Sequence, residues 1–265
     1  RRRGRIIVHR AFRRSVPRSV CRGAGMPSPG PEAAAHAYDR VVSTRVDYDG
    51  EGLDEADLAA TPLEQIRRWV EDASARHTAA GDVPEPLALS LATVDADGAP
   101  NVRTVLMRFL DERGPGFVTA LTSTKGREIA GNPRVAAALV WPSMFHAIRF
   151  RGVAHEVSRE EVEQYFDTRP YGSRISAWTS RQSEPIASRA ALEAAYEEYA
   201  ARWPELGAAG EVPVPDFWGG YRIVPDEVEF WGGRRNRLHD RIVLSRIGPG
   251  TLADAGAWRV HRRQP

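Results

Sequence analysis

Two hydrophobic periods divide the chain into segments predicted to be strands and segments predicted to be helices. Between residues 87 and 153, and again from 221 to 262, apolar side chains recur at every second position, as at Leu87, Leu89 and Leu91. This period puts alternate side chains on opposite faces of a strand. The predicted strands are 87–93, 102–110, 117–121, 135–141, 147–153, 221–224, 228–231, 241–244 and 258–262.

Capping signals and a helical period mark the remaining elements. Thr61-Pro62-Leu63-Glu64 is a capping box with proline at the first helical position. The predicted helices are 61–75, 123–130, 158–169 and 188–203. Short strands with few helices between them favour an antiparallel barrel, and no Gly-x-Gly-x-x-Gly sequence follows a strand. The predicted fold is mainly β with flanking helices, in a single domain over 61–265.

The first sixty residues differ in composition from this domain. Residues 26–60 contain proline, glycine and acids with little apolar periodicity, so we expect the segment 1–60 to be flexible. Residues 1–25 hold nine of the 37 basic residues and none of the 35 acids, which leaves the rest of the chain negatively charged. A negative body argues against a nucleic-acid-binding domain. Since Met26 follows, we interpret 1–25 as upstream sequence rather than a targeting signal.

Cysteine content and hydropathy restrict the cellular setting. Cys21 is the single cysteine, which excludes an internal disulfide and a cysteine-ligated zinc site. No run approaches the ~18 consecutive apolar residues of a membrane helix. We therefore expect a cytoplasmic protein with no metal site and no membrane or nucleic-acid partner.

Two basic segments are candidates for phosphate binding. Arg103 and Arg108 belong to one predicted strand, and the guanidinium fork matches phosphate oxygens. Ser123-Thr-Lys-Gly126 opens a predicted helix, whose free N–H groups can bind an anion. The alternative is that the two arginines are exposed to solvent and that Ser123 is an ordinary helix N-cap. Spacing alone does not decide between phosphate binding and this alternative.

A third candidate is the series Tyr165, Arg169 and Ser173, which recur every four residues. Tyr165 and Arg169 are predicted to share a helix face, and Pro170 is predicted to end the helix so that Ser173 arrives from the next loop. A phenol, a guanidinium and a hydroxyl together would bind phosphate. An amphipathic helix with a packed tyrosine and a solvated arginine is the alternative.

The C-terminal third combines aromatic, glycine and cationic residues. Phe217-Trp-Gly-Gly220 and Phe230-Trp-Gly-Gly233 would let a planar ligand approach closely, although core packing is the commoner use of such pairs. Arg237, His239 and Arg241 alternate, so a strand would direct all three to one face. Placing so many positive charges side by side costs free energy unless an anion binds to them. A surface row paired with acids is the alternative.

With these segments in order, the chain resembles the pyridoxamine 5′-phosphate oxidase family. The similarity runs from about Arg45 to Pro265. The matching sequences are RTVLMR (103–108), NPRV (132–135), YFDTRPYGSRISAW (165–178), RQSE (181–184), VPVPDFWGGYRI (212–223), VEFWGG (228–233) and RLHDR (237–241). The resemblance implies an FMN-binding split β-barrel homodimer with FMN at the subunit interface. Its C-terminal region, about 212–265, would serve dimerisation and substrate binding.

The resemblance also implies roles for individual residues. Arg237 and His239 would lie against the substrate's pyridine ring as the catalytic pair, and 45–53 would form a lid. The implied FMN contacts are Arg103, Val105, Thr119, Lys125, Gln182, Ser183, Trp231 and Arg241. The implied substrate contacts are Arg45, Tyr48, Arg108, Tyr165, Arg169, Ser173, Arg237 and His239.

The implied reaction is oxidation of pyridoxamine or pyridoxine 5′-phosphate to pyridoxal 5′-phosphate, with O₂ reduced to hydrogen peroxide. A related flavin oxidase of secondary metabolism, acting on a dihydrophenazine-type aromatic substrate, is a second hypothesis. A split barrel that binds flavin or pyridoxal phosphate without turnover is a third. An intact phosphate site favours the first, because an aromatic acid has no use for it.

Four positions depart from the family pattern. Arg108 replaces a lysine, Val118 a tyrosine, Thr124 an arginine at the FMN phosphate, and Ala147 a glutamine near the flavin ring. A lost charge-assisted hydrogen bond costs roughly 1.5–3 kcal/mol. We therefore expect flavin binding that is weaker than the family pattern would give.

Overall fold

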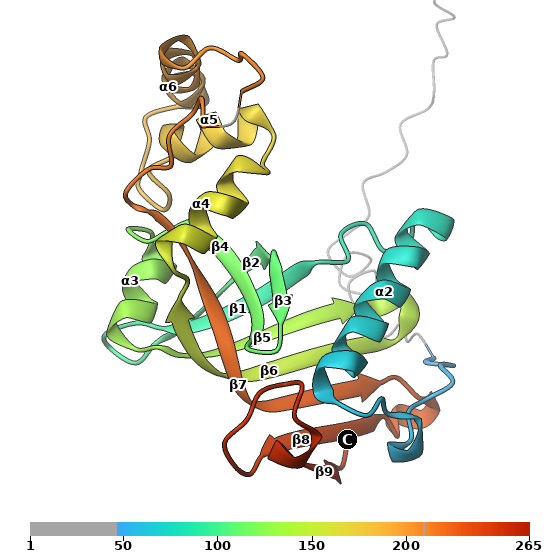
Figure 1. The fold of residues 1–265 in the computed structure, drawn as a ribbon. Helices are drawn as coiled ribbons and strands as arrows, with labels where there is room; N and C mark the ends of the chain where they lie inside the picture. The colour runs from blue at the N-terminus through green and yellow to red at the C-terminus, as the bar shows by residue number, and fades with distance from the viewer. Residues whose placement is uncertain (1–46, 209) are drawn as a thin grey trace, which may run out of the picture. The chain divides into compact units, whose positions relative to one another are not determined.

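The computed structural model describes residues 47–208 and 210–265, and its centre is one curled antiparallel sheet (Figure 1). The strand order is β2-β1-β5-β6-β7-β4-β3, and β8 and β9 extend the sheet from β7. The strands are β1 Ala88–Val94, β2 Pro100–Leu106, β3 Phe109–Asp111, β4 Gly114–Ala120, β5 Arg134–Trp141, β6 His146–Glu156, β7 Trp218–Gly232, β8 Asp240–Arg246 and β9 Trp258–Arg262.

Helices gather at two places around this sheet (Figure 1). The predicted capping box is confirmed, because Thr61 Oγ1 accepts the Glu64 N–H and the Glu64 carboxylate accepts the Thr61 N–H, both at 3.2 Å. The helices are α2 Pro62–Ala80, α3 Thr124–Gly131, α4 Arg159–Asp167, α5 Tyr171–Thr179 and α6 Arg189–Arg202, with 3-10 turns η1 Glu55–Asp57, η2 Pro142–Met144, η3 Arg235–Arg237 and η4 Ala255–Ala257.

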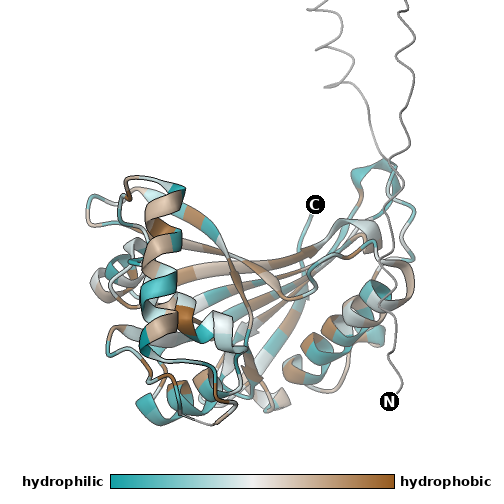
Figure 2. Ribbon diagram, turned by 90° about the horizontal axis from the view of Figure 1, so that it is seen from above, coloured by the Kyte–Doolittle hydropathy of each residue, from teal (hydrophilic) through white to brown (hydrophobic). Residues whose placement is uncertain are grey.

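The two-residue period of the strands produces a core on one face of the sheet. Leu89, Leu139, Ile148 and Phe230 are cross-strand neighbours in one row, and each is 0% exposed. Helix α2 covers this row, with the Trp69 ring 5.4 Å from the Phe230 ring. Figure 2 shows the apolar and polar positions alternating along the curled strands. A mainly β fold with flanking helices is confirmed.

A second apolar cluster attaches α4 and α5 to the start of β7. Phe166 of α4 and Ile175 of α5 are fully buried, and the Trp218 ring lies 5.0 Å from the Phe166 ring. This packing brings the segment between the two helices against the sheet. That segment carries part of the candidate site.

The structure corrects four element predictions. The predicted strands 221–224 and 228–231 are one strand, β7, because it continues past Pro225 through a register shift opposite Gly152. The predicted strand 102–110 is divided into β2 and β3. The predicted helix 158–169 ends at Asp167, and α5, which was not predicted, follows Pro170. Leu53, from the segment 1–60, is 5% exposed and packs in the core.

Gly152 sits where β6 shifts register against β7, and we expect Gly152→Ala to destabilise the fold. An added Cβ would lie 2.2 Å from the Val224 carbonyl oxygen, which is backbone and cannot rotate away. The expected loss is about 1–3 kcal/mol of unfolding free energy, measured by urea denaturation. Gly131→Ala is the control, because its added Cβ meets no atom within 4 Å. Equal stability of the two variants would contradict this role for Gly152.

Candidate functional site

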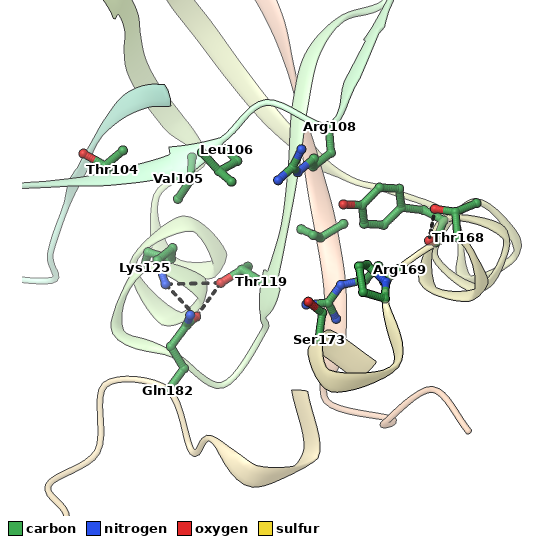
Figure 3. Close-up of a pocket in the computed structure, with 13 residues that line it drawn as sticks. Thr104, Val105, Leu106, Arg108, Thr119, Lys125, Thr168, Arg169, Ser173 and Gln182 are labelled. Atoms are coloured by element: carbon green, nitrogen blue, oxygen red, sulfur yellow. Dashed lines mark hydrogen bonds between the residues drawn. The ribbon is translucent and has the colours of Figure 1, made fainter. Parts of the chain in front are cut away.

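A hollow of about 700 Å³ lies between the sheet and the α4–α5 segment (Figure 3). Its wall combines strands β2 and β4, the start of α3, the α4–α5 segment and the loop after α5. The lining residues are Thr104, Val105, Leu106, Arg108, Val118, Thr119, Lys125, Tyr165, Thr168, Arg169, Pro170, Ser173 and Gln182. They include three cations and no carboxylate. We call this the first hollow.

Lys125 provides the cation on one side of the first hollow. It is the single lysine of the sequence and is 6% exposed. Its Nζ donates to Gln182 Oε1 at 2.7 Å and to Thr119 Oγ1 at 3.2 Å. Burial, reinforced by the charge of Arg103, lowers the pKa of Lys125 to about 8. This ammonium is therefore held by neutral oxygen atoms and lies close to its titration range.

Arg169 provides a second cation, opposite Lys125. It lies in the short segment between α4 and α5, and its guanidinium stacks 4.7 Å from the centre of the Trp218 ring. Its Nη1 is buried and has no hydrogen-bond partner among the described residues. Burial and the nearby charge of Arg108 lower the pKa of Arg169. A buried donor without a partner is costly, so this atom is suited to an anionic ligand.

The predicted set of Tyr165, Arg169 and Ser173 comes together, but by a different route from the one predicted. The helix ends before Arg169, and Pro170 is the N-cap of α5, which places Ser173 in the first turn of that helix instead of a loop. All three line the first hollow together with Arg108, and Figure 3 shows Arg108, Arg169 and Ser173 facing the same space. Spacing alone had left a packed tyrosine and a solvated arginine as the alternative, and the predicted helix boundaries were wrong, yet the three residues line one hollow.

Arg103 does not line the first hollow. Its Nη2 donates to the Glu128 carboxylate at 2.8 Å and its Nη1 to Thr93 Oγ1 at 2.5 Å. Val105 and Thr119 do line the hollow, as does Gln182. Ser183, the next residue, is exposed and has a φ of 75°. Positive φ in a residue other than glycine is uncommon and is found often at functional sites.

A second hollow of about 450 Å³ contains three further predicted residues, Trp231, His239 and Arg241. It shares no lining residue with the first hollow. Its lining residues are Val140, Ala147, Arg149, Glu229, Trp231, His239, Arg241 and Pro265. The residues predicted to bind one cofactor thus fall into two sets within a single chain.

The predicted strand row of Arg237, His239 and Arg241 is wrong, because only Arg241 lies in a strand. Arg237 belongs to the turn η3, where Asn236 and Arg237 have φ values of 57° and 65°, and β8 begins at Asp240. Two consecutive left-handed residues cannot continue a strand. The guanidinium of Arg237 lies instead 5.3 Å from the centre of the Tyr48 ring.

His239 has a defined tautomer. Its Nδ1 is 3.0 Å from the backbone N–H of Arg234 and accepts that hydrogen bond, so the proton of the neutral ring is on Nε2. Burial and the charge of Arg237 lower the pKa of His239. The ring is therefore neutral near pH 7, with Nε2–H as a donor.

The segment 47–54 packs against this turn. Tyr48 makes edge contacts with Trp231 at 6.0 Å and with His239 at 5.2 Å between ring centroids. The Asp240 carboxylate fixes the segment, because it accepts the Leu53 N–H at 2.9 Å as well as bonds from Arg234 and Arg262 at 2.6 Å. Sequence reasoning did not identify Asp240. Arg45, the other predicted lid residue, lies outside the described residues.

Comparison with known proteins identifies the family. The family model described as pyridoxamine 5′-phosphate oxidase matches residues 76–202, and the model of the pyridoxine 5′-phosphate oxidase C-terminal dimerisation region matches 218–265. The pyridoxine/pyridoxamine 5′-phosphate oxidase of Kineococcus radiotolerans is 48% identical over 83% of this chain and 97% of that protein. The chain belongs to the pyridoxamine 5′-phosphate oxidase family. The protein of the same name from Streptomyces avermitilis is 47% identical over 84% of this chain and 96% of its own length.

Solved structures confirm the split-barrel fold of this family. PhzG from Burkholderia lata, in complex with tetrahydrophenazine-1-carboxylic acid, superposes with a TM-score of 0.70 at 30% identity, over 82% of this chain and all of that chain. A pyridoxamine 5′-phosphate oxidase-related, FMN-binding protein from Nostoc punctiforme has a TM-score of 0.56 at 18% identity, over 75% of this chain and 97% of that one, a likeness of fold alone. Within residues 47–208 and 210–265, no helix is long and apolar enough to cross a membrane.

The departures from the family pattern fall at both hollows. Arg108 and Val118 line the first hollow, and Ala147 lines the second. Thr124 is the first residue of α3, where its hydroxyl lies 3.5 Å from the Arg127 guanidinium.

We expect Asp240→Ala to loosen the segment 47–54 and with it Tyr48. The variant removes the acceptor of the Leu53 N–H and leaves the Arg234 guanidinium without its partner. Amide hydrogen exchange at Leu53 should become at least about tenfold faster, since charge-assisted bonds contribute roughly 1.5–3 kcal/mol. Asp226→Ala, which removes an exposed ion pair with Arg134, should leave that exchange rate unchanged. Unchanged exchange in both variants would exclude Asp240 as the anchor.

Proposed function

We propose that this chain is an FMN-dependent oxidase that converts pyridoxamine or pyridoxine 5′-phosphate to pyridoxal 5′-phosphate. The observation that carries the proposal is the composition of the first hollow: Lys125, Arg108 and Arg169 line it and no carboxylate does. None of the three forms an ion pair with an acid in the part of the chain that the structure describes. Such an excess of positive charge favours a ligand with dianionic phosphate groups.

Two phosphate groups fit the two sides of the first hollow. Lys125, with Thr119 and Gln182 beside it, would hold the FMN phosphate, and Ser183 and Val105 would adjoin the cofactor. The second side would bind the substrate phosphate through Tyr165, Arg169 and Ser173. Arg108 would add a second positive charge beside that phosphate. The unpartnered Nη1 of Arg169 supports this assignment, because a phosphate oxygen would satisfy it. Arg103, paired with Glu128, would act through its charge beside Lys125.

A homodimer would unite the two hollows. The C-terminal region that matches the dimerisation family model contains Trp231, His239 and Arg241, which line the second hollow. The phosphate-binding residues lie in the first hollow of the same chain. We propose that the second hollow of one copy faces the first hollow of the other, so that FMN contacts both subunits.

Bound FMN would supply the redox chemistry, accepting a hydride from the substrate C4′ and passing the electrons to O₂. For the alcohol substrate the overall change is pyridoxine 5′-phosphate plus O₂ to pyridoxal 5′-phosphate plus H₂O₂. The amine also consumes water and releases ammonia. The protein residues bind and orient: His239 presents an Nε2 proton to the substrate ring, and Arg237 adds a positive charge beside it. Tyr48 would cover the ring and exclude water.

We expect Arg169→Ala to raise the KM for pyridoxamine 5′-phosphate by about ten- to a hundredfold, since it removes a charge-assisted contact to phosphate. Turnover is followed as pyridoxal 5′-phosphate formed by protein supplied with FMN and O₂. Arg189→Ala is the control, because this arginine has an 80% exposed side chain paired with Glu193 on α6.

The same assay separates the competing functions. A flavin-loaded protein that forms no pyridoxal 5′-phosphate but oxidises a dihydrophenazine carboxylic acid would instead support the function suggested by the likeness to PhzG. Flavin binding without O₂ consumption on either substrate would indicate a binding protein. An Arg169→Ala variant with unchanged KM would contradict the assigned phosphate site.

We expect FMN affinity to fall as pH rises above about 8. The dianionic phosphate favours the protonated Lys125, whose pKa in the free protein is about 8, so above that pH binding must also take up a proton. The Kd for FMN, measured by quenching of flavin fluorescence, should be constant from pH 6.5 to 7.5 and rise toward tenfold per pH unit above 8. Lys125→Arg stays charged and should remove this dependence. A wild-type Kd that is constant up to pH 9.5 would exclude Lys125 as the phosphate ligand.

A further inference from the structure

Glu229 is a buried carboxylate for which the proposed reaction has no role. It lies on β7 between the core residues Val228 and Phe230, and its side chain is 1% exposed. Alternation along the strand directs it away from the core, to the same face as Trp231. An ionised carboxylate in such a place is costly unless cations surround it.

Three arginines, on β6, on β8 and directly after β9, surround this carboxylate. Arg149 is its cross-strand partner on β6 and donates to both oxygens at 3.2 Å. Arg241 on β8 donates through Nε and Nη2, each at 2.9 Å, and Arg263 donates at 3.1 Å. Burial alone would raise the pKa of Glu229, but the hydrogen bond from Arg241 and the three positive charges hold that pKa below its usual value.

This arrangement fixes the guanidinium of Arg241. The bidentate pair with Glu229 uses two of its five N–H groups, and Nη1 donates to the Gln264 carbonyl oxygen at 3.1 Å. Two N–H groups therefore remain for a ligand in the second hollow, on a side chain that can no longer rotate freely. Glu227, two residues earlier on β7, accepts hydrogen bonds from Arg263 but forms no hydrogen bond or ion pair with Arg241.

The charges around Glu229 also indicate a ligand in the second hollow. Arg149, Arg241 and Arg263 carry three positive charges, and Glu229 and Glu227 carry two negative ones. A purely structural ion pair that links the strands would need only one arginine beside Glu229, whereas three are present. The excess charge next to Trp231 is suited to an electron-rich or anionic ligand.

We propose that Glu229 is a positioning residue that holds Arg241 in the orientation in which it binds the flavin. The inference rests on the proposed function, because it takes the flavin as the ligand of the second hollow. Its physical basis is preorganisation: a donor fixed before binding loses less side-chain entropy when the ligand arrives.

The test compares Glu229→Gln with the matched control Glu227→Gln in the full-length protein. We expect the Kd for FMN, from fluorescence quenching, to rise at least about tenfold in Glu229→Gln and less than about twofold in Glu227→Gln. Thermal unfolding without FMN and the oligomeric state from light scattering report whether each variant keeps its fold and assembly. Loss of assembly in Glu229→Gln with wild-type assembly in Glu227→Gln would overturn the inference, because Glu229 would then act on the interface.

A double-mutant cycle with Arg241→Gln identifies the route of the effect. If Glu229 acts through Arg241, the change Glu229→Gln should alter Kd by less than about twofold in the Arg241→Gln background. A full tenfold effect there, or a wild-type Kd in the single variant, would overturn the inference. If Glu229→Gln does not fold, Glu229→Asp, which keeps the charge but withdraws the carboxylate, enters the same cycle.

The outcomes separate this inference from the proposed function. A wild-type protein that neither binds FMN nor oxidises a phosphorylated B6 vitamer would remove the proposed function and with it the basis of the inference. A wild-type protein that does both, together with Glu229→Gln indistinguishable from it, would overturn the inference alone.

Discussion

The pairing of β7 with three other strands is the constraint on which the rest of the structure depends. This strand pairs with β4 near its start, with β6 along most of its length and with β8 near its end. Because side chains alternate along it, one face contributes Phe230 to the core while the other contributes Glu229 and Trp231 to the second hollow. A shift of one residue in this register would exchange the two faces. The register that buries the core residues of β7 therefore also places Glu229 and Trp231 at the second hollow.

The first hollow depends on a different kind of order. The segment between α4 and α5 is too short to have structure of its own, and the stacking of Arg169 on Trp218 and the packing of Phe166 determine where it lies. Trp218 is the first residue of β7, so this side of the hollow is attached to the same strand that carries the second one. The fold thus brings each set of ligand-binding groups to one end of a shared strand.

Sequence periodicity predicted strands such as β1, β5 and β6 because buried and more exposed positions alternate along them, and capping residues located the start of α2. It failed where local backbone conformation overrides the pattern. Arg237 and Arg241 look like one strand row, yet the left-handed conformation at Asn236 and Arg237 makes a turn, which alternation cannot reveal. The site residues within familiar motifs were predicted from the resemblance, not from spacing. Glu229 and Asp240 were not singled out, because an acid in a strand pattern gives no sign of how many cations it will meet.

The cations of the site divide into two kinds, and this division has a consequence for binding. Arg108 and Arg169 carry planar guanidinium groups, which accept an anion in a limited set of orientations. Lys125 is a flexible donor held only by neutral oxygen atoms, and its pKa of about 8 makes it the group of the first hollow that responds to pH. In the proposed assignment, the substrate phosphate would therefore meet two planar guanidinium groups and the cofactor phosphate an ammonium whose charge depends on pH. The proposed cofactor phosphate depends on that one ammonium, because Thr124, its neighbour in the first turn of α3, carries no charge.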